Sequence, residues 1–184
     1  MSRQPAHPDQ ARAHAARLPG RREALLALAG LLGGLPALAL DAPAGKVLLT
    51  VSGAVTVTNG PAGADFDLAM LDALPQHAFT TATPWFKTPR RFSGPLLRDV
   101  LAAAGAQGAK TLKAVALNNY KAEIPAEDAR TFKMILATRL DDKPMSLREK
   151  GPLFIIYNFD ESAELRQERY YSRSAWQLRA LEVK

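Results

Sequence analysis

The sequence of 184 residues contains no cysteine and only three histidines. Two of these histidines lie among the first 14 residues, so His77 is the only one in the rest of the chain. Disulfides and thiolate ligands are therefore excluded, and zinc would have to be held mainly by carboxylates. There is no G-x-S-x-G motif, phosphate loop or dinucleotide fingerprint either, and we interpret His77 as a structural or surface residue.

The chain also has little excess charge once its first part is set aside. Residues 1–23 are basic, residues 24–40 form an apolar run rich in glycine, and Ala37, Leu38 and Ala39 follow the small-x-small pattern of signal peptidase sites. We predict a cleavable signal peptide at 1–39 and a single periplasmic domain at 40–184. Export would use either the general secretion route or the twin-arginine route. That domain has 19 basic and 16 acidic residues, a net charge of +3, which disfavours nucleic-acid binding.

Short apolar and β-branched segments dominate the predicted domain. Strand patterns occupy 46–58 as two strands that meet near Ser52 and Gly53, and 113–125 as two strands around an Asn118–Asn119 turn. Further strand patterns occupy 77–83, 134–140 and 153–159, and a final strand includes Trp176. Helix patterns follow Asp67 and Ser93, the second ending at Gly105, and 126–129 is at most one helical turn. Strands outnumber helices without regular alternation, so we predict an α+β fold with a mixed, largely antiparallel β-sheet and short helices.

Aromatic rings recur beside amides, hydroxyls and guanidiniums in four segments. These combinations could form a pocket in which rings cover a flat heterocycle and polar groups read its edge. An alternative assigns Trp176, Phe86, Phe92 and Phe159 to the core, which is the more frequent place for such rings. The four segments are Trp85 to Arg91, Asn118 to Tyr120, Tyr157 to Phe159, and Tyr170 to Ser174 followed by Trp176.

Four stretches in the same order resemble the sulfite-oxidase-type molybdopterin-binding fold. They are WFKTPRRFSGPLLRDVLAAAG, ALNNYKAEIP, ILATRLDDKPMSLREKGPLFIIY and SRSAWQLRALEV. In the molybdenum enzymes of this fold, a cysteine before the aromatic turn binds the metal. Here Thr81 or Thr83 would occupy that place, and a neutral hydroxyl cannot replace a soft thiolate. Asn118, Asn119 and Ala175 stand where cofactor-binding or substrate-binding cations are usual, which favours a binding protein over an enzyme.

Among proteins of this fold, the chain most resembles the small, exported, cysteine-free PruR-like pterin-binding proteins. This resemblance implies binding of a free, reduced pterin without metal. It also implies that the protein reports the pterin to a membrane-bound partner that metabolises cyclic-di-GMP, or to another signalling protein. No segment of this chain has the features needed to make or degrade a nucleotide messenger.

From the chemistry of a pterin we assign candidate roles to individual residues. Stacking planes are expected from Trp85 and Tyr120, and Arg90 or Arg173 would stack or donate to the ring carbonyl. Asn118, Asn119 and Ser172 would face the amine side, and Tyr171 belongs to the same ring-bearing segment. The charged loop Asp141 to Gly151 is the candidate for an exposed element that changes on loading, although a solvated connector is an alternative.

Two other functions remain open from the sequence. One is a molybdopterin-dependent oxidoreductase whose metal is held only by the cofactor's dithiolene sulfurs. The other is a degenerate fold that serves as a protein-interaction module.

Overall fold

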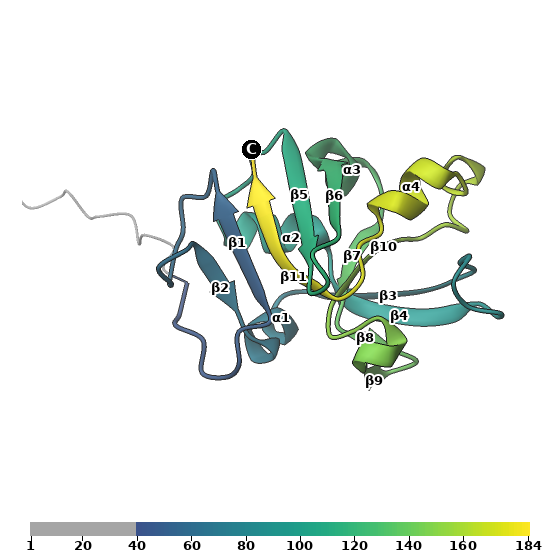
Figure 1. The fold of residues 1–184 in the computed structure, drawn as a ribbon, viewed down its shortest axis with the longest axis horizontal. Coiled ribbons are helices and arrows are strands. Elements are labelled where there is room, and N and C mark those ends of the chain that lie inside the picture. The colour runs from purple at the N-terminus through teal and green to yellow at the C-terminus, as the bar shows by residue number, and fades with distance from the viewer. Residues whose placement is uncertain (1–39) are drawn as a thin grey trace, which may run out of the picture. The chain divides into compact units, whose positions relative to one another are not determined.

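The computed structural model describes residues 40–184, and the predicted signal peptide at 1–39 lies outside the described residues. Figure 1 shows the arrangement of its elements. The strands are β1 (Leu49–Gly53), β2 (Ala64–Phe66), β3 (Gln76–Thr81), β4 (Arg90–Pro95), β5 (Thr111–Ala116), β6 (Lys121–Pro125), β7 (Met134–Ala137), β8 (Arg139–Leu140), β9 (Lys143–Pro144), β10 (Phe154–Tyr157) and β11 (Leu178–Val183). The helices are α1 (Leu68–Ala73), α2 (Leu97–Ala103), α3 (Ala126–Thr131) and α4 (Glu168–Arg173), with single 3-10 turns η1 (Leu147–Glu149) and η2 (Ala163–Leu165).

The largest sheet has five strands in the order β2-β1-β11-β5-β6. Only the central pair of β1 and β11 is parallel, and the other pairs are antiparallel. The last strand of the chain, β11, therefore lies in the middle of the sheet, beside the first strand, β1. This arrangement confirms the predicted α+β class with a mixed, largely antiparallel sheet.

Two smaller sheets form the other part of the domain. The hairpin of β3 and β4 extends through β8 to β9, and β7 pairs with β10. A bridge between Phe154 and Trp176 joins β10 to the segment that leads into β11. The small sheets therefore carry the loop between β3 and β4 to the same end of the domain as α4, as Figure 1 shows.

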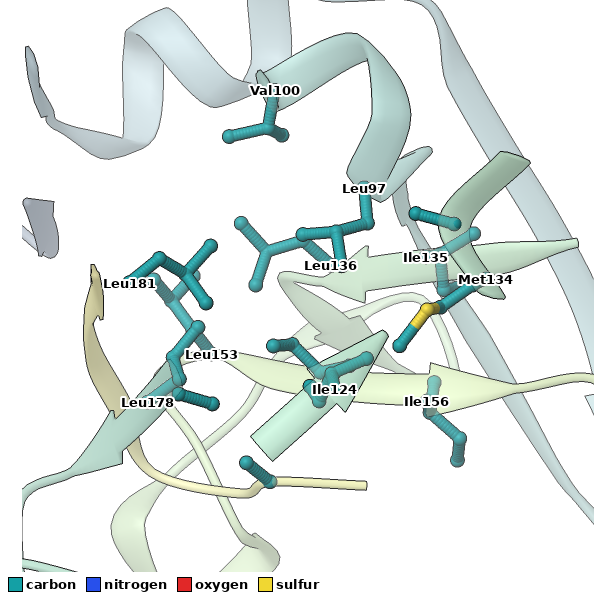
Figure 2. Packing of buried hydrophobic residues seen from close by; sticks show 14 of the residues in the cluster. Leu97, Val100, Ile124, Met134, Ile135, Leu136, Leu153, Ile156, Leu178 and Leu181 are labelled. Atoms are coloured by element: carbon teal, nitrogen blue, oxygen red, sulfur yellow. The ribbon is translucent and has the colours of Figure 1, made fainter. Parts of the chain in front are cut away.

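The core lies between the five-stranded sheet, α2 and the β7–β10 pair. Figure 2 shows Leu97 and Val100 of α2 pointing toward the strands that carry Leu136 and Leu181, and all four side chains are fully buried. Full burial of a side chain of this size contributes roughly 1.5–3 kcal/mol. Packing thus compensates for the shortness of α2, which has no side-chain cap.

The predicted helix ends are confirmed in two places and wrong in one. Asp67 caps α1, where its carboxylate accepts hydrogen bonds from the Met70 N–H at 2.9 Å and the Gly45 N–H at 2.7 Å. These bonds hold the pKa of Asp67 below its ordinary value. Gly105 ends α2 with a φ of 67°. Ser93 does not cap α2, because it lies within β4 and pairs with Ala78 of β3.

The pattern in 46–58 produces one strand instead of two. Gly53 has a φ of 88°, and a Cβ atom there would lie 2.2 Å from the Val183 carbonyl oxygen. The chain turns at this point, and the Ala54 N–H makes the next bond to the same carbonyl at 3.0 Å. Apolar residues after Gly53 therefore leave the sheet. None of the helices within 40–184 has the length and apolar character to cross a membrane.

Candidate functional site

Trp85, in the loop between β3 and β4, is the centre of a cluster of aromatic rings. Its indole makes edge-to-face contacts with Phe154 at 5.5 Å, Phe159 at 6.1 Å, Tyr171 at 6.0 Å and Trp176 at 5.4 Å between ring centroids. Such pairs contribute roughly 0.5–1.5 kcal/mol each beyond area burial. The partly buried indole is therefore fixed by four rings that come from distant parts of the chain.

A groove of about 280 Å³ opens beside this cluster, and we call it the aromatic groove. The β3–β4 loop, the turn between β5 and β6, α4 and the segment after α4 contribute to it. This volume is near the lower end of small-molecule sites, which suits a compact planar ligand. The lining residues are Pro84, Trp85, Tyr120, Glu168, Tyr171, Ser172, Ser174 and Trp176.

Tyr120 joins two walls of the aromatic groove. Its hydroxyl donates a hydrogen bond to the Ser172 carbonyl at 2.8 Å, and 45% of the residue remains exposed. The turn that presents it is stabilised by the Tyr120 N–H, which donates to Asn118 Oδ1 at 3.0 Å, and by Asn119 with a φ of 65°. The phenol ring is therefore held at the groove while much of its surface remains open to a ligand.

Glu168 is the only carboxylate among the residues that line the aromatic groove, and none of them is lysine or arginine. It lies in the first turn of α4 and is exposed. The hydrogen bonds and ion pairs within residues 40–184 leave its side chain without a partner. An ionised carboxylate offers two acceptor oxygens, so this end of the groove is suited to a ligand edge with adjacent N–H groups.

Lys150 lies over the tryptophans from the side of the loop Asp141 to Gly151. Its Nζ atom is 4.0 Å from the Trp176 ring centroid and 5.9 Å from that of Trp85. The residue has a φ of 72°, and its carbonyl accepts a hydrogen bond from the Gln177 N–H at 2.9 Å. Burial lowers the pKa of Lys150 from its ordinary value. The loop therefore contacts the aromatic cluster directly.

The two predicted guanidinium donors do not line the aromatic groove. Arg173 donates to Asp128 Oδ2 at 2.9 Å, and the Tyr157 hydroxyl donates to the same oxygen at 2.7 Å. Burial, together with the Asp128 hydrogen bond, raises the pKa of Tyr157 well above its ordinary value. Arg90 donates to Asp141 at 2.6 Å and lies 5.1 Å from the Phe86 ring centroid. Both arginines are thus engaged in ion pairs within the domain.

The two threonines predicted at the cysteine position have structural contacts. Thr81 is fully buried, and its hydroxyl accepts a bond from the Asp160 N–H at 3.2 Å. Asp160 in turn accepts from the Ala82 N–H at 2.7 Å, so this pair joins the end of β3 to the segment after β10. Thr83 accepts from the Trp85 N–H at 3.3 Å and thereby helps to position the indole.

The structure brings together four of the predicted residues, namely Trp85, Tyr120, Tyr171 and Ser172. Asn118 and Asn119 shape the turn behind Tyr120 without lining the groove. Sequence reasoning missed Glu168 as a groove residue and Lys150 as a contact of the tryptophans, and it left Trp176 between core and pocket. Glu168 gave only one signal, its position two residues before the Tyr170–Tyr171 pair. Lys150 contacts Trp176, which lies 26 positions later in the sequence, without a local pattern.

Comparisons with known proteins agree with this architecture. Residues 72–157 match the family model described as the oxidoreductase molybdopterin binding domain. The crystal structure of the sulfane dehydrogenase SoxCD from Paracoccus pantotrophus is similar over 78% of this chain, with a TM-score of 0.55 and 15% sequence identity. The match covers 39% of that SoxCD chain, so the present chain spans about two fifths of its length. No curated protein matches the sequence.

The protein therefore has the sulfite-oxidase-type molybdopterin-binding fold, as its sequence motifs predicted. The matched segment includes Trp85, Tyr120 and Lys150, whereas α4 with Glu168 follows it.

The residues present fit the organic part of a molybdopterin better than its metal. Aromatic side chains line the groove, but the chain offers no thiolate, and the Thr81 hydroxyl is already bonded to backbone. Within 40–184, no three His, Cys, Asp or Glu residues are grouped to hold a metal ion. Glu168 would also repel the phosphate of the cofactor's tail, since no cation lines the groove beside it.

Proposed function

We propose that this protein binds a free pterin in the aromatic groove without molybdenum, and that it serves as a periplasmic sensor of that pterin. The observation that carries the proposal is a groove that combines several fixed aromatic rings with one unpaired carboxylate, in a chain that has no thiolate. A flat, neutral heterocycle with N–H groups on one edge matches this combination.

The pyrimidine edge of a pterin carries a ring N–H beside an exocyclic amine. Glu168 can accept both of these N–H groups with its two oxygens, which forms a charge-assisted, bidentate contact. Trp85, Trp176 and Tyr120 supply apolar ring surface for the bicyclic system. The short, uncharged tail of a free pterin needs no cation, and none lines the groove.

The sensor role requires that binding is reported to another protein. The resemblance to the PruR-like proteins names a membrane-bound enzyme of cyclic-di-GMP metabolism as that partner. Two features of this chain support an indirect output: it lacks nucleotide-binding motifs, and Lys150 brings the exposed loop Asp141 to Gly151 against the groove's tryptophans.

A molybdopterin-dependent oxidoreductase is the second candidate, because the family model for the oxidoreductase molybdopterin binding domain matches this chain. The intact cofactor would use the same ring contacts. Its metal would be held by its own dithiolene sulfurs instead of by a protein thiolate.

One preparation separates these functions. The purified chain is analysed for molybdenum and then titrated anaerobically with a reduced pterin, with binding followed by quenching of tryptophan fluorescence. We expect one pterin per chain, a Kd of roughly micromolar or below, and no stoichiometric molybdenum. One tightly bound molybdenum atom per chain would support the oxidoreductase. Failure to bind any reduced or oxidised pterin would contradict both the sensor and the oxidoreductase. The protein-interaction module would then be the remaining function.

A further inference from the structure

A second and larger groove lies apart from the aromatic one. It has a volume of about 480 Å³, and we call it the apolar groove. The segment that leads into β1, the β5–β6 turn, the segments on both sides of η1 and the start of β11 form its walls. No residue lines both grooves. The lining residues are Lys46, Val47, Leu48, Thr50, Leu117, Met145, Leu147, Pro152, Leu178 and Arg179.

Exposed aliphatic side chains are concentrated in the apolar groove. Val47 is 41% exposed, Leu117 is 48% exposed and Leu147 is 59% exposed. Within 40–184 the only other large hydrophobic residue with such exposure is Tyr120, which belongs to the aromatic groove. Single exposed apolar residues are common, but their clustering around a concavity is typical of an interaction site.

The charge of the apolar groove has a single sign. Lys46 and Arg179 line it, and no carboxylate does. Ten of the 19 lysines and arginines in residues 40–184 form ion pairs, and Lys46 and Arg179 are among the nine that do not. The Arg179 guanidinium donates only to neutral oxygens, those of the Ala116 carbonyl at 3.3 Å and the Asn119 side chain at 3.4 Å. Both cations therefore remain available to a negatively charged partner.

The walls of the apolar groove are fixed by hydrogen bonds through one residue. The Gln177 side-chain amide donates to the Leu147 carbonyl at 3.0 Å, and the Gln177 carbonyl accepts from the Leu117 N–H at 2.8 Å. These bonds hold Leu117 and Leu147, the two most exposed leucines within residues 40–184, on either side of Gln177. A preformed groove of this kind lowers the ordering cost of binding.

We propose that the apolar groove docks an acidic segment of a partner protein, one that inserts leucine- or phenylalanine-type side chains and places carboxylates near Lys46 and Arg179. A concave groove favours a chain segment over a flat membrane surface, which cannot enter it. The inference that this segment belongs to the signalling partner rests on the proposed sensor function. The groove itself depends only on the residues described here.

The test uses the purified chain from residue 40 onward, which is the predicted mature protein, and a fluorescein-labelled helical peptide of about 16 residues, with leucine at positions i, i+3, i+4 and i+7 and glutamate at most other positions. A matched peptide carries lysine in place of glutamate, and vesicles containing phosphatidylserine represent a membrane. We expect saturable binding of the acidic peptide, about tenfold or more tighter than that of the basic peptide, and no binding to vesicles.

Two variants of the apolar groove and one control variant test whether the acidic peptide binds in this groove. Leu147→Glu and the double variant Lys46→Glu, Arg179→Glu should each weaken acidic-peptide binding about tenfold or more. Lys133→Glu, an exposed lysine outside the groove, should leave it unchanged. Equal binding of the two peptides, equal effects of groove and control variants, binding to vesicles alone, or no binding at all would overturn the proposal. Pterin titration of the same wild-type sample is a separate readout: its failure would contradict the sensor function and leave the docking result standing.

Discussion

The aromatic and apolar grooves differ in the chemistry that each presents. The aromatic groove combines rings fixed by mutual packing with one carboxylate, Glu168, and has no cation in its lining. The apolar groove combines exposed aliphatic side chains with Lys46 and Arg179 and has no carboxylate. A small heterocycle with N–H donors matches the first, and a peptide segment that carries carboxylates matches the second. The proposed ligand and the proposed partner segment therefore differ in both shape and charge.

One segment of the chain contacts both regions. In the loop Asp141 to Gly151, Lys150 contacts the tryptophans of the aromatic groove, and Met145 and Leu147 line the apolar groove. Gln177 ties these ends together, because its N–H donates to the Lys150 carbonyl and its side chain donates to the Leu147 carbonyl. A shift of Lys150 on ligand binding would thus reach Leu147 by two routes. One is the pair of hydrogen bonds made by Gln177, and the other is the main chain, in which Lys150 is three residues after Leu147.

The largest expected effect follows from removing the central ring. Trp85→Ala should lower pterin affinity about hundredfold, because stacking on an aromatic ring contributes roughly 1–3 kcal/mol and the four neighbouring rings also lose a packing partner. Fluorescence or calorimetric titration measures this change. Phe86→Ala is the matched control, since Phe86 packs on Phe92 and lies outside the groove. Equal losses in both variants would contradict a specific role for Trp85, and acidic-peptide binding should be unchanged in either.

The second prediction tests whether Arg173 stabilises the fold or binds the ligand. Arg173→Met leaves Asp128, which is 8% exposed, with only the Tyr157 hydroxyl as partner. We expect the free energy of unfolding to fall by about 2–3 kcal/mol, at or below the lower end for breaking a buried ion pair because Arg173 is itself partly exposed. Urea denaturation measures the loss. Pterin affinity should change less than about threefold. A selective loss of affinity with unchanged stability would instead support the ring-reading role predicted from the sequence.

The arginines show what a sequence can and cannot predict here. The fold class, the Asp67 cap and the Asn118–Asn119 turn were predictable because periodicity, capping and turn chemistry act within a few residues. Arg90 and Arg173 were reasonable candidate ligand contacts by residue type, but their carboxylate partners lie 51 and 45 positions away. Tertiary pairing of this kind has no local signal. The same reason explains why Glu168 was missed, since only folding places α4 opposite the β3–β4 loop.

Glu168→Gln tests the carboxylate that distinguishes the aromatic groove. The substitution keeps the shape of the side chain, removes its charge and replaces one acceptor with a donor. A hydrogen bond to a charged group contributes roughly 1.5–3 kcal/mol, so pterin affinity should fall at least about tenfold. Glu161→Gln, at another exposed glutamate outside the groove, provides the control in the same titration. Unchanged affinity in Glu168→Gln would mean that the ring edge is read by other groups.

Lys150→Met tests the connection between the grooves. A cation over an exposed or half-buried tryptophan contributes roughly 0.5–1 kcal/mol, so pterin affinity should change only about two- to fivefold. The stronger expectation concerns coupling: pterin should alter acidic-peptide affinity in the wild type and have no such effect in the variant. Peptide titrations with and without pterin measure this difference. Lys143→Met, in the same loop but outside both grooves, should keep the coupling, and its loss there would show that the effect is not specific to Lys150.

The smallest effect concerns the anchor at the start of the loop. The Arg91 N–H and the Arg90 guanidinium both donate to Asp141 and hold its pKa below the ordinary value of 3.8. Because the pKa is lower in the folded state, this stabilisation is complete above the ordinary value and is lost as pH falls through the lowered one. Asp141→Asn should therefore have a slightly lower free energy of unfolding than the wild type at pH 6, by about 0.5 kcal/mol or less since the pair is solvent-exposed, and this difference should shrink as the pH falls below 3.8. A difference that stays constant over this range would show that the Asp141 charge does not anchor the loop.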